Sequence, residues 1–156
     1  MKIIIVGGVA GGATAAARLR RLNENAQIII FERSGYISYA NCGLPYYVGD
    51  VIKDKNELTL QTPDSFWERF RIDVRVRHEV TAIDPEKKTV SVHGLDSGKE
   101  YEETFDKLIL SPGARPVVPN MSGIDLDKVF TLRTVEDTLK IRKFVDENHP
   151  KSAVIA

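Results

Sequence analysis

The stretch that decides the fold stands at the N-terminus and reads Lys2-Ile3-Ile4-Ile5-Val6-Gly7-Gly8-Val9-Ala10-Gly11-Gly12. The apolar run that ends at Val6 is typical of a short strand buried on both faces. The glycines after it let backbone N–H groups approach a pyrophosphate, whose negative charge is favoured at a helix N-terminus. The stretch therefore predicts a strand followed by a phosphate-binding turn.

The residues that follow extend this unit. Residues 13–22 read as a helix, and residues 27–32 read as a second buried strand that ends in Glu32. Glu32 lies twenty residues after Gly12, where a carboxylate can accept hydrogen bonds from a ribose and disfavours a 2′-phosphate. Val9 occupies the middle glycine position of the usual G-x-G-x-x-G pattern. The order of elements nevertheless predicts the first unit of a dinucleotide-binding fold, and a glycine-rich turn without ligand is the alternative.

Cys42 is the only cysteine in the sequence, and it lies in the run Ser38-Tyr39-Ala40-Asn41-Cys42-Gly43-Leu44-Pro45-Tyr46-Tyr47. We expect a short helix over residues 42–48, with Asn41 or Cys42 as its cap. The thiolate is the reactive form of cysteine, and a helix N-terminus favours it. A thiol so close to a nucleotide-binding turn suggests redox chemistry, while a small buried apolar residue is the alternative reading.

The rest of the chain predicts an α/β fold, with a Rossmann-like parallel sheet and a small antiparallel β insertion. A helix is expected to begin at Thr62 and Pro63, and another to run from Thr134 to about Asn148. The expected strands cover residues 73–77, 79–83, 89–92, 101–105, 107–111 and 152–156. The last strand mirrors residues 2–6 and lacks a following turn, so we expect the fold to be incomplete, with a second dinucleotide motif beginning after Ala156.

Composition narrows the class of protein. The 156 residues suffice for one sizeable core, and 22 basic residues balance 22 acidic ones, so no nucleic-acid partner is indicated. No apolar run is long enough to span a membrane, and no secretory signal is evident. A single cysteine excludes an internal disulfide framework, which suits the cytoplasm. No cluster of residues predicts a metal site.

Together these motifs resemble the single-cysteine branch of the pyridine nucleotide–disulfide oxidoreductases. That branch holds coenzyme A-disulfide reductases, NADH oxidases and peroxidases, and per- and polysulfide reductases. The run Asn41-Cys42-Gly43-Leu44-Pro45-Tyr46 is the most specific part of the resemblance, which spans nearly the whole chain. The branch often lacks the middle glycine, so Val9 also fits.

The resemblance implies FAD as cofactor, NADH or NADPH as co-substrate, and Cys42 as the catalytic nucleophile. It implies that Glu32 holds the adenosine ribose, with Arg33 near the adenine and Val80 meeting it through the backbone. The full set of implied cofactor-binding residues is Gly7, Gly8, Val9, Ala10, Gly11, Gly12, Glu32, Arg33, Asn41, Val80, Ser111, Pro112, Gly113 and Arg133.

The resemblance also implies a substrate site. Residues matching those that bind coenzyme A are Thr14, Arg18, Arg21, Ser38 and Asn41. Thr14, Arg18 and Arg21 are spaced to share one face of a helix, which could receive phosphates. A solvated basic face is the alternative. One basic position of the family's site is Phe70 here, although Arg69 and Arg71 flank it.

The expected function is FAD-dependent, NAD(P)H-linked reduction of coenzyme A disulfide or a polysulfide through Cys42. Reduction of oxygen or peroxide through a cysteine sulfenic acid remains open, as does a non-catalytic FAD-binding fragment. We expect residues 1–156 to be the N-terminal segment of a discontinuous FAD-binding domain, without an NADH domain and inactive alone. The full-length protein is expected to be a homodimer.

Overall fold

The computed structural model describes residues 1–155, which form two compact units. The first unit comprises Met1–Tyr39 and Thr59–Gly113, and the second comprises Ala40–Leu58 and Ala114–Ala156. Each unit is described separately below. Among the described residues, none of the helices combines the length and the apolar character that crossing a membrane requires.

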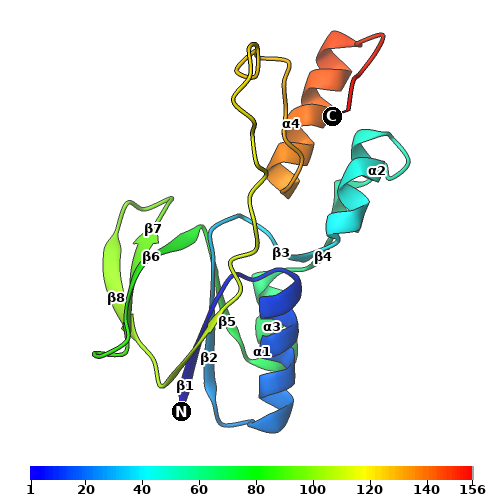
Figure 1. Cartoon of the computed structure of the whole chain (residues 1–156). Helices are drawn as coiled ribbons and strands as arrows, with labels where there is room; N and C mark the ends of the chain where they lie inside the picture. Colours follow the sequence, from blue (N-terminus) through cyan, green and yellow to red (C-terminus); the bar gives the residue numbers. More distant parts are fainter. Residues whose placement is uncertain (156) are drawn as a thin grey trace. The chain divides into compact units, whose positions relative to one another are not determined.

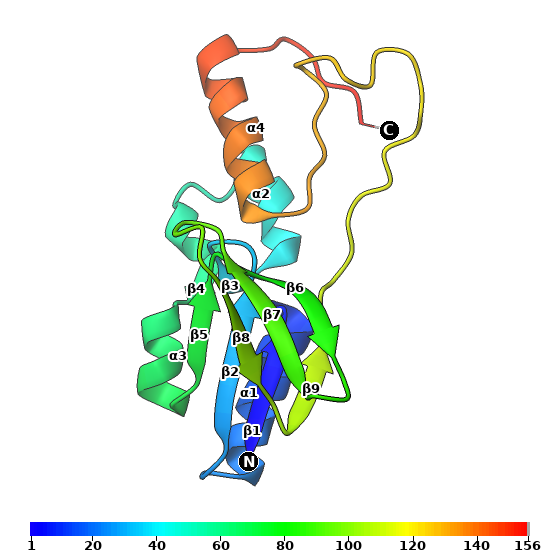
Figure 2. The ribbon, with the colours of Figure 1, turned by 90° about the vertical axis from the view of Figure 1, so that its left-hand side faces the viewer.

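The first unit is built around a four-stranded parallel sheet in the order β5-β2-β1-β9, and Figure 2 labels all four strands. Its strands are β1 (Lys2–Val6), β2 (Gln27–Glu32), β5 (Asp73–Val76) and β9 (Lys107–Leu110). Two helices belong to the unit, α1 (Ala10–Leu22) and α3 (Pro63–Phe70). This strand order is that of a dinucleotide-binding half, so the predicted fold class is confirmed.

Two smaller sheets complete the first unit. The antiparallel sheet of β6 (His78–Asp84), β7 (Thr89–Gly94) and β8 (Glu100–Thr104) confirms the predicted insertion. The short strands β3 (Ile37–Tyr39) and β4 (Thr59–Gln61) also pair antiparallel. This second pair was not predicted, because each strand has only three residues and β4 is polar at both ends.

Both faces of the central strands are buried, but against different layers. Ile3, Ile5 and Ile30 belong to a core with Ala16 of α1 and Phe66 of α3. Figures 1 and 2 show α1 and α3 on one face of the sheet and the antiparallel sheet on the other.

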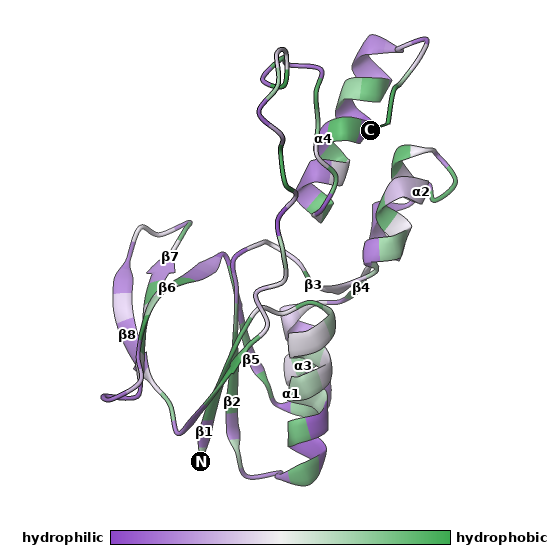
Figure 3. Ribbon diagram, viewed as in Figure 1, coloured by the Kyte–Doolittle hydropathy of each residue, from purple (hydrophilic) through white to green (hydrophobic). Residues whose placement is uncertain are grey.

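On the opposite face, Ile4, Ile29 and Phe31 pack with Val90 and Val92 of β7. Both valines are almost completely buried, and β8 on the outside is largely hydrophilic (Figure 3). The parallel sheet is therefore covered on both sides, as all-parallel sheets require.

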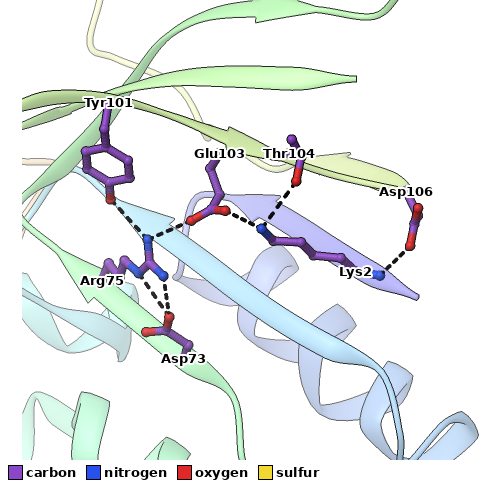
Figure 4. A network of polar contacts seen from close by, with 7 residues as sticks. All are labelled: Lys2, Asp73, Arg75, Tyr101, Glu103, Thr104 and Asp106. Atoms are coloured by element: carbon purple, nitrogen blue, oxygen red, sulfur yellow. Dashed lines mark hydrogen bonds and ion pairs between the residues drawn. The ribbon is translucent and has the colours of Figure 1, made fainter. Parts of the chain in front are cut away.

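Charged residues join the strands at the rim of this second core (Figure 4). Glu103 of β8 accepts hydrogen bonds from Lys2 of β1 and, at 3.1 Å, from Arg75 of β5. Arg75 also pairs with Asp73 at 2.8 Å and reaches the hydroxyl of Tyr101 at 3.2 Å. Burial disfavours the charged form of Glu103, but the hydrogen bonds from Lys2 and Arg75 outweigh it and lower its pKa.

Removal of this carboxylate is expected to cost stability at neutral pH and less in acid. Glu103→Gln should lower the free energy of unfolding by about 1–3 kcal/mol at pH 7. Because the folded-state pKa of Glu103 lies below its ordinary value of 4.5, the stabilisation is present above that pH. It is lost as the pH falls through the folded-state pKa, so the difference between variant and wild type should shrink in acid.

Urea unfolding at pH 7 and below pH 4 measures both effects. Glu102→Gln is the matched control, because Glu102 is an exposed neighbour on the same strand. A loss of stability for Glu103→Gln that stays constant with pH would contradict this account.

The second unit contains α2 (Leu44–Val48), α4 (Val135–Asn148) and the 3-10 turns η1 (Asn41–Gly43) and η2 (Lys55–Glu57). Arg142 of α4 joins the two α-helices, because it donates to the carbonyl of Tyr47 at 3.4 Å and to Asp50 at 2.9 Å. The same guanidinium pairs with Asp146 one turn along α4.

Helix starts agree with the sequence at two places. Thr62 caps α3 in a capping box with Ser65, and Thr134 caps α4 in a capping box with Asp137. The helix α1 begins at Ala10, ahead of the predicted Ala13, because Gly11 and Gly12 already lie in its first turn.

One predicted element is contradicted. Residues 152–155 form no strand, and Val154 and Ile155 are exposed. A strand requires a paired neighbour, and among residues 1–155 none pairs with this segment. Ala156, the last residue of the predicted strand, lies outside the described residues.

Candidate functional site

The turn between β1 and α1 depends on glycine at two positions. Gly7 has a φ of +95°, and a Cβ there would lie 2.0 Å from the carbonyl oxygen of Ser111. A Cβ on Gly12 would lie 1.8 Å from the carbonyl oxygen of Gly7. The turn is therefore held by close backbone approaches that no larger residue allows.

The start of α1 is free of side-chain caps. Val9 precedes the helix without a side-chain hydrogen bond to it, and its first turn contains no acidic residue. The first N–H groups of a helix need partners, and an anionic ligand supplies them. This end of α1 therefore fits the pyrophosphate of a dinucleotide, and Val9 in place of the middle glycine does not prevent the turn from forming.

Glu32 ties the end of β2 to this turn. Its carboxylate is only 8% exposed and accepts hydrogen bonds from the backbone N–H of Gly8 at 2.7 Å and of Ser34 at 2.8 Å. An ionised carboxylate offers about four acceptor positions, so two remain for hydroxyl groups of a ligand. The acid is thus oriented toward the turn, as a ribose-binding role requires.

The remaining predicted flavin residues of the first unit lie in two places: on the segment after β9, and where the end of β2 meets β6. Ser111 donates its N–H to the carbonyl of Val6 at 2.7 Å, and its hydroxyl borders Gly11, so the turn after β9 adjoins the glycine turn. Pro112 and Gly113 follow Ser111 directly. Arg33 pairs with Glu79 at 3.3 Å, one residue before Val80 in β6.

A pocket of about 260 Å³ opens beside α1. Its polar lining comes from Thr14 and Arg21 of α1, Ser38 of β3, Gln61 of β4 and Arg69 of α3. The apolar lining consists of Ala13, Ala17, Phe66 and Phe70. Two arginines on separate helices thus border one pocket, together with hydroxyl groups and an apolar wall.

Three of the predicted substrate residues therefore meet in this pocket: Thr14, Arg21 and Ser38. Arg18 is exposed and lies outside the lining, and Asn41 belongs to the second unit. The sequence did not single out Gln61 as a lining residue. In the sequence, Arg69 stands out only as a neighbour of Phe70, whereas in the structure both residues border the pocket.

Cys42 is exposed in the turn η1, directly before α2. The expected helix over residues 42–48 is confirmed only from Leu44 on, because Cys42 and Gly43 lie in the 3-10 turn before it. The reading of Cys42 as a buried apolar residue is wrong. The expected cap is also wrong, because neither η1 nor α2 has a side-chain cap. Asn41 uses its amide oxygen to accept a hydrogen bond from Arg133 at 2.9 Å instead.

The sequence pattern described as "Pyridine nucleotide-disulphide oxidoreductase" matches residues 1–155. The chain belongs to this family. The predicted enzyme class is thereby confirmed at the level of the family, whose members are FAD enzymes that use NADH or NADPH. The cofactor prediction is confirmed at the same level.

Individual relatives agree with the family. A coenzyme A disulfide reductase of Staphylococcus haemolyticus is 45% identical over 154 residues, which cover 99% of this chain and 34% of that protein. The crystal structure of reduced Bacillus anthracis CoADR-RHD matches with a TM-score of 0.94 and 50% identity, covering 96% of this chain and 27% of that chain. A NAD-dependent persulfide reductase from A. fulgidus gives a TM-score of 0.89 and 34% identity, covering 95% and 28%. The chain thus spans about a third of its curated relatives.

Proposed function

We propose that the intact protein carries out FAD-dependent, NAD(P)H-linked reduction of a small disulfide or persulfide, with coenzyme A disulfide as the first candidate. The observation that carries this proposal is the pocket bordered by Arg21 and Arg69. The names of the relatives, coenzyme A disulfide reductase and persulfide reductase, support the same class of substrate.

The lining of the pocket suits a ligand with phosphates and an apolar part. A guanidinium binds phosphate oxygens through paired N–H donors, and hydroxyl groups such as those of Thr14 and Ser38 add further contacts. Phe66 and Phe70 supply apolar surface next to these groups. Although Phe70 replaces a basic residue of the family, we propose that Arg69 supplies the positive charge in its place.

The glycine turn and Glu32 are proposed to hold the flavin dinucleotide. The uncapped N–H groups of α1 would face its pyrophosphate, and the free acceptor positions of Glu32 would face its ribose. Arg33 and Val80 are proposed on the adenine side, with Ser111, Pro112 and Gly113 closing over the dinucleotide. FAD, when bound, accepts hydride from a nicotinamide and supplies electrons in pairs.

Cys42 is proposed as the nucleophile. Its thiolate would attack one sulfur of the substrate disulfide, which forms a mixed disulfide with Cys42 and releases the other half as a thiolate. Delivery of two electrons to the mixed disulfide then releases the second thiolate and restores Cys42. Because Cys42 is exposed, a substrate disulfide can reach its sulfur.

The organisation of the whole protein is part of the proposal. We propose that this chain is the N-terminal segment of a discontinuous FAD-binding domain in a homodimeric cytoplasmic enzyme. One observation supports the incomplete domain: the chain spans about a third of the length of its curated relatives. The single cysteine supports a reducing compartment.

Arginine substitutions in the pocket are expected to separate the two candidate substrates. In the intact protein, Arg21→Ala and Arg69→Ala should each raise the KM for coenzyme A disulfide by about tenfold or more, because each removes a charge-assisted phosphate contact. The KM for a small inorganic polysulfide, which has no phosphate, should change less than about twofold. Steady-state kinetics with NADH and both acceptors measure this difference.

Arg71→Asn is the matched control, because Arg71 is an exposed arginine of the same region that does not line the pocket, and asparagine tolerates its φ of 52°. Equal effects of Arg21→Ala on both acceptors would mean that these arginines form a solvated basic face. If oxygen or peroxide supports NADH consumption, and neither coenzyme A disulfide nor polysulfide does, the protein is an oxidase or peroxidase instead.

A further inference from the structure

The turn that carries Cys42 is fixed on both sides of the cysteine. On one side, Arg133 donates to the amide oxygen of Asn41. On the other side, Gly43 is buried, and a Cβ there would lie 3.1 Å from Leu58 and 3.4 Å from Ile52. Cys42 is therefore an exposed residue between one neighbour held by a hydrogen bond and another that is tightly packed.

Arg133 is itself held firmly. Its backbone N–H donates to Asp137 at 3.0 Å, and the same carboxylate oxygen accepts from the N–H of Thr134 at 2.9 Å. The guanidinium Nε also donates to the carbonyl of Ala114 at 3.3 Å. The start of α4 thus anchors Arg133, and Arg133 in turn anchors Asn41.

We infer that Arg133 is a positioning residue, which orients the thiol of Cys42 through its hydrogen bond to the side chain of Asn41. This inference rests on the proposed nucleophilic role of Cys42. It assigns to Arg133 a task besides any contact with the flavin. A guanidinium has five N–H donors, and within residues 1–155 two of them donate to Asn41 and Ala114, so both tasks are compatible.

A double-mutant cycle in the intact protein tests the inference. Arg133→Ala and Asn41→Ala should each lower kcat for disulfide reduction by about tenfold to a hundredfold, because each removes the same charge-assisted hydrogen bond. The double variant should be no slower than the slower single variant, since the two residues act through one contact. Arg133→Lys should restore part of the activity, because lysine can still donate to Asn41.

Arg142→Ala is the matched control, since Arg142 also joins α4 to the cysteine segment but at its far end, through Tyr47 and Asp50. Its kcat should stay within about threefold of wild type. An equal loss in Arg142→Ala would mean that α4 supports this segment only structurally, and additive losses in the double variant would mean that Arg133 and Asn41 act separately. Either result overturns the inference.

Flavin content, read from its absorbance, separates the two tasks of Arg133. Loss of flavin from Arg133→Ala together with full kcat in Asn41→Ala would assign Arg133 to the flavin alone and overturn the inference. The proposed function fails on different evidence, namely unchanged turnover after replacement of Cys42. The two proposals can therefore be rejected independently.

Discussion

Cys42→Ser in the intact protein is expected to abolish disulfide reduction while leaving the flavin in place. Serine has the size of cysteine, but its hydroxyl cannot form the mixed disulfide, so turnover should fall by roughly a thousandfold or more. The fold should tolerate the change, because Cys42 is exposed and the turn around it is held by Asn41 and Gly43.

NADH-dependent turnover of coenzyme A disulfide and of polysulfide should be measured together with flavin content. Thermal unfolding of the variant provides the control for folding. Turnover near the wild-type rate, with flavin still bound, would show that Cys42 is not the nucleophile.

Gly12→Ala is expected to have the largest effect on the fold. The added Cβ would lie 1.8 Å from the carbonyl oxygen of Gly7 and 3.2 Å from Ile5, so the backbone of the turn must move. We expect a loss of about 4 kcal/mol or more in the free energy of unfolding, or failure to fold. Flavin should be lost as well, because the same turn is proposed to hold the pyrophosphate.

Two further glycine variants provide a comparison even if Gly12→Ala does not fold. Gly49→Ala is the control, because its Cβ would meet nothing closer than 3.5 Å at a φ of −81°, and it should change stability by less than about 0.5 kcal/mol. In Gly11→Ala, the added Cβ would lie 2.5 Å from the hydroxyl of Ser111, at the end of a side chain. The loss of stability should therefore be smaller, and Ser111→Ala should relieve it. Urea unfolding of all variants provides the comparison, and a stable, flavin-containing Gly12→Ala would contradict it.

The parts of the fold that were predictable carry strong local signals. The apolar run of β1 has no polar interruption between Ile3 and Val6, so a buried strand is its simplest reading. Thr62 and Thr134 predict helix starts because their side chains accept hydrogen bonds from the first helical turn, and the structure has both bonds.

The parts that were missed depend on contacts distant in sequence. The strands β3 and β4 are stable only as a pair, so neither three-residue segment shows the pattern alone. Arg69 borders the pocket because α3 packs beside α1, which no spacing within residues 63–70 reveals. Likewise, Asn41 and Arg133 are 92 positions apart, and a hydrogen-bond partner at that distance has no local signature.

The antiparallel sheet of β6–β8 has a consequence for how this fold can change over time. Val90 and Val92 are 0% and 1% exposed because they cover Ile4, Ile29 and Phe31 of the central strands. A descendant that lost residues 78–104 would present three large apolar side chains to water. The antiparallel sheet is therefore part of the core of this unit and not a dispensable addition. Lineages that keep the dinucleotide unit must keep this sheet or bury the same face of the parallel sheet under another element.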